Sequence, residues 1–193
     1  MTLKRVDEQY RGLTYPWGRL DHPDETPFEV APGVWWLRFT MPGPLNHINL
    51  WLLEDGDGWT IVDTCLNLET AKAHWEALFD GFMGGKPVKR VICTHMHPDH
   101  IGLAGWLCER FACDLYMTQA EFLTGSLIMG YTGEQAPSAA ISFYHRSGFS
   151  TSQLDHYRNR FGAFGQFTTP LPHNYQRLTD RQTLAIGGRY WQI

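Results

Sequence analysis

The sequence predicts an α/β layered domain, and three observations lead to this prediction. Strand segments joined by turns are predicted over residues 33–63, before any helix. Units of strand, helix and strand follow them, which is the order typical of α/β folds. A dense run of histidines then comes directly behind one strand, at the place where open α/β sheets collect reactive groups. A chain of 193 residues is long enough for one such domain with a full hydrophobic core.

Three strands are predicted in succession before any helix. Gly33 to Thr40 carries an apolar run, and Asn46 to Glu54 alternates between apolar and polar residues. The turn Asp55-Gly56-Asp57-Gly58 is a strong hairpin signal that leads into a strand from Trp59 to Asp63. We therefore expect hairpin-linked strands in this part of the chain.

Strand–helix–strand units come next. A helix with Asn67 as its N-cap is predicted to end at Gly81. Val88 to Cys93 is a short continuous apolar strand of the kind that is buried on both faces. A second helix is predicted from about Asp99 to Phe111, and Asp114 to Thr118 is predicted to be the next strand.

The chain changes character after this strand. We interpret residues 119–169 as a helical, aromatic-rich insertion, with a capping box at Ser150 to Gln153 before a helix from Leu154 to Phe161. Such a segment would suit a lid over a bulky or acyl substrate, although packing among the helices explains its aromatic residues equally well. Two strands, Thr183 to Ile186 and Arg189 to Ile193, are expected to close the chain.

Composition limits the class of protein. Residues 1–27 are polar and rich in proline, so we expect an extended N-terminal arm followed by one domain over residues 28–193. The net charge of −4 and the lack of a long Lys/Arg cluster argue against nucleic-acid binding. No apolar run approaches the roughly 20 residues of a membrane span, and the start of the chain lacks the apolar region of a secretion signal. The four cysteines form no Cys-x-x-Cys pair and are interpreted as buried reduced thiols, so a cytoplasmic protein is expected.

The strongest functional signal is the run His95-x-His97-x-Asp99-His100 behind the apolar strand. Neutral imidazole is the commonest metal-ligand side chain, and a carboxylate adds a hard oxygen ligand. Residues two apart in an extended chain point to the same side, so His95 and His97 can hold one cation. Asp99 and His100 fall in the first turn of the next helix, which suits a second cation. In the alternative interpretation Asp99 is a helix N-cap and the histidines are polar surface residues. That interpretation would suit a single histidine, but it does not account for a cluster of this kind.

These residues resemble the signature of the metallo-β-lactamase superfamily. Their setting does too, because a strand ending Ile61-Val62-Asp63-Thr64, a helix and an apolar strand precede the motif. The resemblance covers roughly Val30 to Thr118 and, more loosely, Arg177 to Ile193, and it is most similar to the glyoxalase-II-like branch of metal-dependent hydrolases. It implies a four-layer αββα sandwich made of two similar halves. This chain would hold the N-terminal half and the start of the second half.

Residue by residue, the resemblance implies that His95 and His97 bind one metal and that Asp99 and His100 bind another. Asp63 would hydrogen-bond a ligand histidine and fix its orientation, the alternative being a strand-end Asp that starts a turn. Zinc is the implied metal, with two ions in the complete protein, and iron is the alternative; no other cofactor is implied. Metal-bound hydroxide would attack a small-molecule substrate such as a thioester, lactone or lactam, and Asp99 would orient this nucleophile as the catalytic carboxylate.

The resemblance also implies ligands that this sequence does not show. Superfamily members complete the site with a third His, a bridging Asp and a final His, and residues 183–193 resemble the hairpin just before the third His. His145, His156 and His173 lack the expected context and are interpreted as structural or surface residues. We therefore expect a shortened chain, or a second half supplied by another chain, with weak metal binding and little activity of these residues alone. The apolar sheet face left exposed would suit a homodimer or a swapped partner.

Three other functions stay open at this point. A mononuclear iron persulfide dioxygenase of the same superfamily has an overlapping ligand motif, so iron would favour it and zinc would favour the hydrolase. A nuclease is disfavoured by the acidic charge balance. A non-catalytic half-domain would bind a partner through its exposed sheet. Cys65 and His47, which lie near the site in sequence order, are interpreted as a packed thiol and a polar strand residue, and the sequence does not name the substrate.

Overall fold

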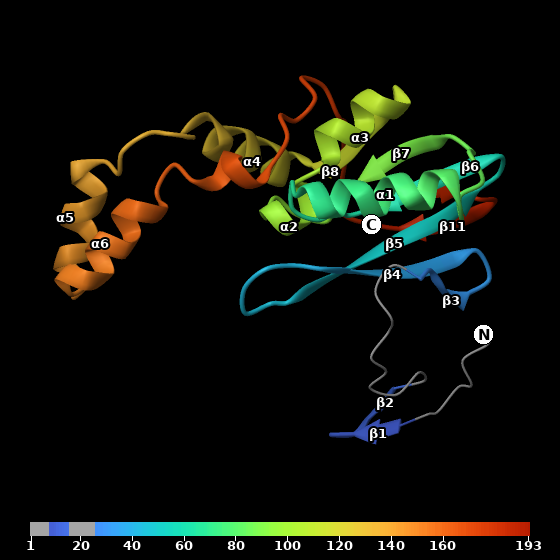
Figure 1. The fold of residues 1–193 in the computed structure, drawn as a ribbon, viewed down its shortest axis with the longest axis horizontal. Helices are drawn as coiled ribbons and strands as arrows, with labels where there is room; N and C mark the ends of the chain where they lie inside the picture. The colour runs from blue at the N-terminus through green and yellow to red at the C-terminus, as the bar shows by residue number, and fades with distance from the viewer. Residues whose placement is uncertain (1–7, 16–25) are drawn as a thin grey trace.

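A mixed seven-stranded sheet lies at the centre of the computed structural model, which describes residues 8–15 and 26–193 (Figure 1). Its strands lie in chain order from β3 to β9, with antiparallel pairing from β3 to β6 and parallel pairing from β6 to β9. The strands are β3 (Phe28–Ala31), β4 (Val34–Thr40), β5 (His47–Asp55), β6 (Gly58–Val62), β7 (Val88–Ile92), β8 (Asp114–Thr118) and β9 (Gln176–Leu178). The prediction of an α/β fold class is confirmed.

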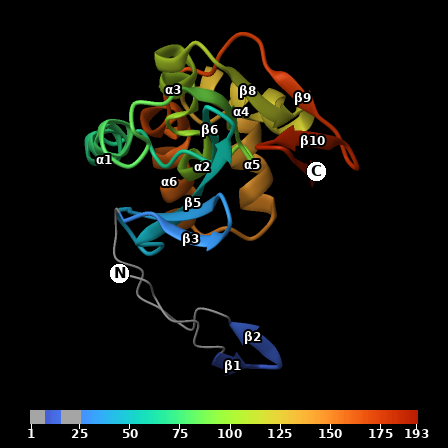
Figure 2. The same ribbon diagram turned by 90° about the vertical axis from the view of Figure 1, so that its right-hand side faces the viewer.

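Some of the helices pack on one face of this sheet, and others extend away from it. The helices are α1 (Glu69–Asp80), α2 (Pro98–Ile101), α3 (Ala104–Phe111), α4 (Gln119–Gly130), α5 (Ser138–Arg146) and α6 (Thr151–Arg160), with a short 3₁₀ helix, η1 (Phe164–Phe167). Trp75 of α1 and Leu107 of α3 are fully buried against Leu50 and Ile61 of the sheet. Burial of apolar surface between this face and the helices is the main source of stability of the domain. Figure 1 shows α5 and α6 side by side and away from the sheet, and in Figure 2, which is viewed from the other end, they lie behind it.

The hairpin of β10 (Thr183–Ile186) and β11 (Arg189–Gln192) packs on the other face of the sheet. Ile186 is buried there in a small cluster with Leu53 and Ile92. The carboxylate of Asp55 fixes the hairpin, because it accepts a hydrogen bond from the backbone N–H of Gly187 at 3.0 Å and pairs with Arg90 at 3.1 Å. The predicted pair of closing strands is therefore present and docked.

Several predicted elements have nearly the predicted bounds. The strands predicted from Asp114 and from Thr183 match β8 and β10, and the continuous apolar strand is β7, which has parallel neighbours on both sides. The capping box is also present, since the Ser150 side chain accepts from the backbone N–H of Gln153, and the Gln153 side chain accepts from Ser150. Local sequence patterns therefore describe the parallel part of the sheet well.

The single helix predicted over residues 99–111 is wrong, because the structure divides it into α2 and α3. The backbone N–H of Leu103 donates to the hydroxyl of Thr64 at 3.0 Å. The carbonyl of Gly102 accepts from both the backbone N–H and the hydroxyl of Thr169, at 2.7 and 3.0 Å. Segments far away in the sequence thus take the hydrogen bonds that a continuous helix would use.

Three further expectations differ from the structure. Asn67 is not the N-cap of α1: Leu68 holds that position, and the backbone N–H of Asn67 donates to the carbonyl of Phe167. The short strands β3 and β9 were not predicted, because their pairing with β4 and β8 defines them rather than a strong pattern of their own. Within the expected arm, residues 8–15 form a hairpin of β1 (Glu8–Tyr10) and β2 (Leu13–Tyr15), and its other residues before 26 lie outside the described part of the chain.

The described helices are short or carry many polar residues. In residues 8–15 and 26–193, no helix combines the length and the apolar character that a bilayer crossing needs.

Substitution of Gly105 by Ala tests the contact between α3 and the segment after η1. A Cβ atom at Gly105 would lie 1.8 Å from the carbonyl oxygen of Pro170, so the backbone would have to move. We expect Gly105→Ala to lower the free energy of unfolding by about 3 kcal/mol, measured by urea denaturation, because overpacking against backbone is poorly relieved. Gly130→Ala is the matched control: Gly130 is also helical and has no atom within 4 Å of its Cβ position. Equal midpoints for the two variants would contradict the close packing of α3.

Candidate metal centre

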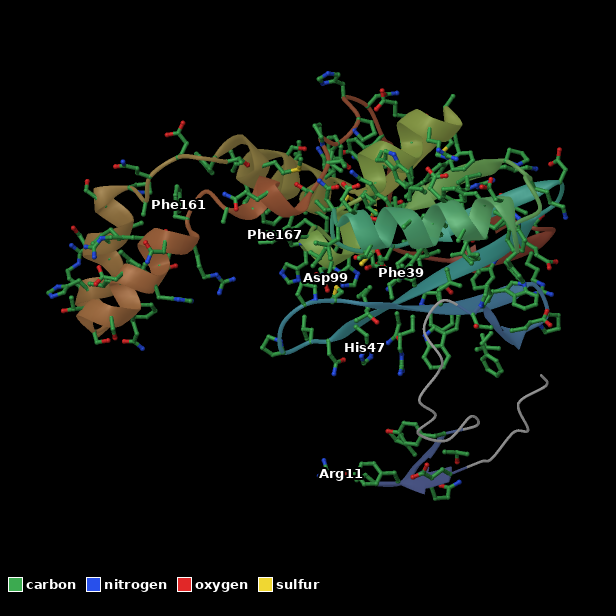
Figure 3. All side chains as sticks on the ribbon, in the orientation of Figure 1. Arg11, Phe39, His47, Asp99, Phe161 and Phe167 are labelled. Atoms are coloured by element: carbon green, nitrogen blue, oxygen red, sulfur yellow. The ribbon has the colours of Figure 1, made fainter. Side chains whose placement is uncertain are left out.

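The histidine run lies where the chain leaves the carboxyl end of β7. His95 and His97 lie in the loop after this strand, and Asp99 and His100 lie in α2. Pro98 occupies the first position of α2, where its fixed φ suits a helix start and its missing N–H costs nothing. The structure therefore gathers all four predicted donors at one edge of the sheet, and Figure 3 shows Asp99 there beside α2.

The four side chains form two pairs of donor atoms. The Nε2 atom of His95 lies 3.0 Å from the Nδ1 atom of His97. The Oδ2 atom of Asp99 lies 3.4 Å from the Nε2 atom of His100. Donors bound to one tetrahedral zinc ion at 2.0–2.1 Å are separated by roughly 3.3 Å, so each pair has a suitable spacing. The rings of His95 and His100 lie 3.8 Å apart between centroids and bring the two pairs side by side.

The donor set fits a metal in chemistry and in pairwise spacing, but it is not a closed site. Within residues 8–15 and 26–193, no group of three or more His, Cys, Asp or Glu side chains is arranged to hold a metal ion. Each pair supplies two donors, whereas a catalytic zinc ion usually has three protein ligands.

Asp63 joins the ends of β6 and β7 beneath these donors. Its carboxylate is buried and accepts hydrogen bonds from the backbone N–H and the hydroxyl of Thr94, at 2.8 and 2.9 Å. It also lies 2.9 Å from the Nδ1 atom of His100. A carboxylate that accepts from one ring nitrogen holds the proton there and leaves the other nitrogen free as a ligand. The geometry therefore suits the orienting role that was predicted for Asp63.

The pKa values of His95 and His100, whose rings face each other, are shifted in opposite directions. Burial, followed by the nearby His100 and His97, lowers the pKa of His95, which favours the neutral imidazole that binds metal. Burial acts to lower the pKa of His100 too, but the hydrogen bond and charge of Asp63 and the charge of Asp99 outweigh it and raise that pKa. The contact with Asp63 thus favours the protonated form of His100 in the metal-free protein.

Two positioning contacts were not predicted. The hydroxyl of Thr94 lies 3.0 Å from the Nδ1 atom of His95, so this side chain contacts both Asp63 and a candidate ligand. The carboxylate of Glu121 on α4 accepts from the backbone N–H of Met96 at 2.8 Å and fixes the loop between the two loop histidines. Thr94 lies directly between the apolar strand and His95, so its position in the sequence could have indicated a role at the site. Nothing in the sequence connects Glu121 with the motif.

The remaining candidates lie outside the donor cluster. Cys65 is fully buried, and burial raises the pKa of its thiol to about 12, which agrees with a packed thiol. His47, labelled in Figure 3, lies at the start of β5. Its ring contacts the side chain of Asn46. His145 and His173 are exposed. His156 is exposed as well, but it lines a cavity together with His97.

The fold and the donor cluster together define a class of protein: an α/β domain with candidate metal ligands at the carboxyl ends of its parallel strands. The family model described as the metallo-beta-lactamase superfamily matches residues 43–175. The chain belongs to this superfamily, whose members depend on metal ions.

Solved structures agree with this assignment. A beta-lactamase domain protein from Burkholderia ambifaria has a TM-score of 0.76 and 38% identity, over 92% of this chain and 50% of that chain. A metallo-beta-lactamase family protein from Thermus thermophilus has a TM-score of 0.65 and 26% identity, over 85% of this chain and 52% of that chain. The predicted metallo-β-lactamase-like fold is confirmed, and the chain spans about half the length of these proteins.

Similar curated proteins match over shorter stretches. A linear primary-alkylsulfatase from Pseudomonas sp is 39% identical over 75 residues, which are 39% of this chain and 10% of that protein. A probable metallo-hydrolase from Bacillus subtilis is 33% identical over 94 residues, which are 48% of this chain and 40% of that protein. These relatives support a hydrolase fold and do not identify a substrate.

Substitution of Asp63 by Asn tests the proton-holding contact. In the metal-free protein we expect Asp63→Asn to lower the pKa of His100, because the charge that raises it is lost while burial remains. Protonated His100 stabilises the folded state below the unfolded pKa of about 6.5, and this contribution is lost as the pH rises through the raised folded pKa, so the variant should also lose stability at low pH. NMR titration of the His100 ring measures the shift. The control is Asp80→Asn at the exposed end of α1, and the same His100 pKa in both variants would refute the contact.

Proposed function

We propose that this chain carries the ligand motif of a metal-dependent hydrolase that acts on a small ester-like substrate such as a thioester, lactone or lactam. One observation carries the proposal: two pairs of donor atoms lie side by side above a buried carboxylate at the carboxyl ends of parallel strands. Superfamily membership supports it, as do the similar proteins named as a metallo-hydrolase and an alkylsulfatase.

The residues of this chain have separate roles in the proposal. His95 and His97 would hold one metal ion, and Asp99 and His100 would hold a second. A bound zinc ion would supply Lewis acidity, which lowers the pKa of bound water to about 7 and polarises a carbonyl group. The Asp63 carboxylate would accept a hydrogen bond from Nδ1 of His100, which leaves the Nε2 atom of His100, 3.4 Å from Asp99, as the metal-binding nitrogen. The second carboxylate oxygen of Asp99 would orient a water molecule as the catalytic group, and residues 8–15 and 26–193 supply no group of three or more donors.

A second candidate function is favoured by one other feature. An apolar hollow of about 390 Å³ lies between the large sheet and the β10–β11 hairpin, and it is lined by Trp51, Val62 and Trp191 among others. We propose as the alternative that this face is covered by a second copy or a swapped segment of the protein. A cytoplasmic location belongs to both proposals and is supported by the four free cysteines, three of them buried. Sedimentation of the purified chain tests the alternative, and a stoichiometric complex without turnover in zinc would favour it over the hydrolase.

Zinc binding tests the ligand roles directly. We expect zinc to bind the metal-free chain weakly, because each donor pair is incomplete, and His97→Ala to weaken it by about tenfold or more, in line with the effect of lost metal-site contacts. Chelator-competition titration measures the affinity. His145→Ala is the control, since His145 is an exposed histidine on α5. Identical zinc affinity in the two variants would exclude the assigned ligands.

The chemistry is tested with the same variants. We expect slow thioester or lactone hydrolysis by the zinc-loaded chain, reduced by about tenfold or more in His97→Ala and unchanged in His145→Ala. Elemental analysis of the purified protein separates the hydrolase from the iron persulfide dioxygenase. Iron retained in preference to zinc, with no hydrolysis, would overturn the hydrolase proposal.

A further inference from the structure

A cavity of about 920 Å³ opens directly beside the candidate metal centre. One wall is formed by residues 96–98, which include the candidate ligand His97. The other walls are formed by α6, η1 and the end of α4. Small-molecule sites have volumes of about 300–1,000 Å³, so this cavity has the size of a small-molecule site.

Aromatic side chains line most of the cavity. Tyr131, Tyr157 and Phe161 form a chain of neighbouring rings, with centroids 5.9 and 6.0 Å apart, and Phe164 and Phe167 of η1 add to it. Several of these rings stay open to solvent: Tyr131 is 44% exposed and Phe167 is 42% exposed. Exposed aromatic residues that gather around one cavity indicate a surface that a ligand covers.

The lining of the cavity also carries a cationic group, the guanidinium of Arg160. Arg160 and His156 line it from α6, and no Asp or Glu is among the described residues of its lining. Within residues 8–15 and 26–193 the guanidinium group of Arg160 makes no ion pair, whereas Arg158, two residues earlier on the same helix, pairs with Asp155. An unpaired guanidinium group beside an apolar cavity attracts an anion.

Arg160 and the metal motif belong to different walls. In Figure 1 α6 lies away from α2, and in Figure 3 the side chains of Phe161, Phe167 and Asp99 follow one another from the α6 side to the motif. A molecule that fills the cavity therefore contacts His97 at one wall and Arg160 at another, with aromatic rings along its length.

We propose that this cavity binds an amphiphilic anion: an aromatic ring or short acyl chain that carries a carboxylate or sulfate, with the anionic group at Arg160 and the bond to be cleaved beside His97. The aromatic walls take the apolar part, and the absence of acidic groups in the described lining leaves the charge of Arg160 unopposed. This inference rests on the proposed hydrolase function, because it assigns the cavity to the substrate of that enzyme.

A matched pair of ligands tests the charge preference without any metal. Binding of 4-phenylbutyrate and of the uncharged 4-phenylbutanol to the metal-free 193-residue chain is measured by calorimetry at low salt. We expect the anion to bind about fivefold more tightly, which is the scale of an exposed ion pair, and the preference to shrink in about 0.5 M NaCl. Arg160→Gln should remove the preference and leave the affinity for the alcohol unchanged. Arg158→Gln is the control, because Arg158 lies on the same helix but lines a different hollow.

A second measurement places the ligands in the cavity. The side-chain methyl signals of Met96 and Ile128, which line it from opposite elements, should shift with either ligand in NMR spectra, and Phe164→Ala should weaken both ligands. Equal affinity for the two ligands, a preference that survives in Arg160→Gln, or no binding at all would overturn the proposal. Since none of these measurements uses metal or turnover, failure of the zinc and hydrolysis experiments is distinguishable from failure of this one.

Discussion

The buried carboxylate of Asp63 is the group on which the candidate metal centre depends. It lies just after β6 in a left-handed conformation, with φ of 61°, and it accepts hydrogen bonds from Thr94 while it faces the ring of His100. One side chain thus connects the carboxyl ends of two parallel strands with α2. A buried carboxylate without partners is costly, so the contacts that satisfy Asp63 are also the contacts that fix the orientation of His100.

Thr64, the residue after Asp63, connects the end of β6 with the helices that pack on the sheet. The hydroxyl of Thr64 donates to the carbonyl of His100 and accepts from the backbone N–H of Leu103, and its carbonyl accepts from the indole of Trp75. The loop after β6 therefore holds α2 against the packed core of α1 and α3. Because protein cores are densely packed, the ligand motif is held by the same contacts that stabilise the domain.

The helices of residues 119–169 form most of the wall of the cavity, whereas the sheet positions the candidate metal ligands. Strand ends and α2 place a rigid set of donor atoms, and α4, α6 and η1 place a wall of aromatic side chains and Arg160 beside it. Chemistry and substrate choice would then be divided between a fixed scaffold and a segment that is able to vary without disturbing the core. Glu121 connects the two parts, since it lies on α4 and holds the backbone of Met96 inside the motif.

The sequence by itself determined the fold class, the parallel strands β7 and β8, and the run of four candidate donors, because each of these is encoded in residues that are close together along the chain. Periodicity and spacing are local signals. Only the tertiary structure decided the division into α2 and α3, which depends on Thr169, 67 residues beyond Gly102. The same holds for the contact of Asp63 with Thr94, 31 residues apart, and for that of Glu121 with Met96, 25 residues apart. Such hydrogen bonds exist only once the strand order brings distant segments together, so no local pattern in the sequence specifies them.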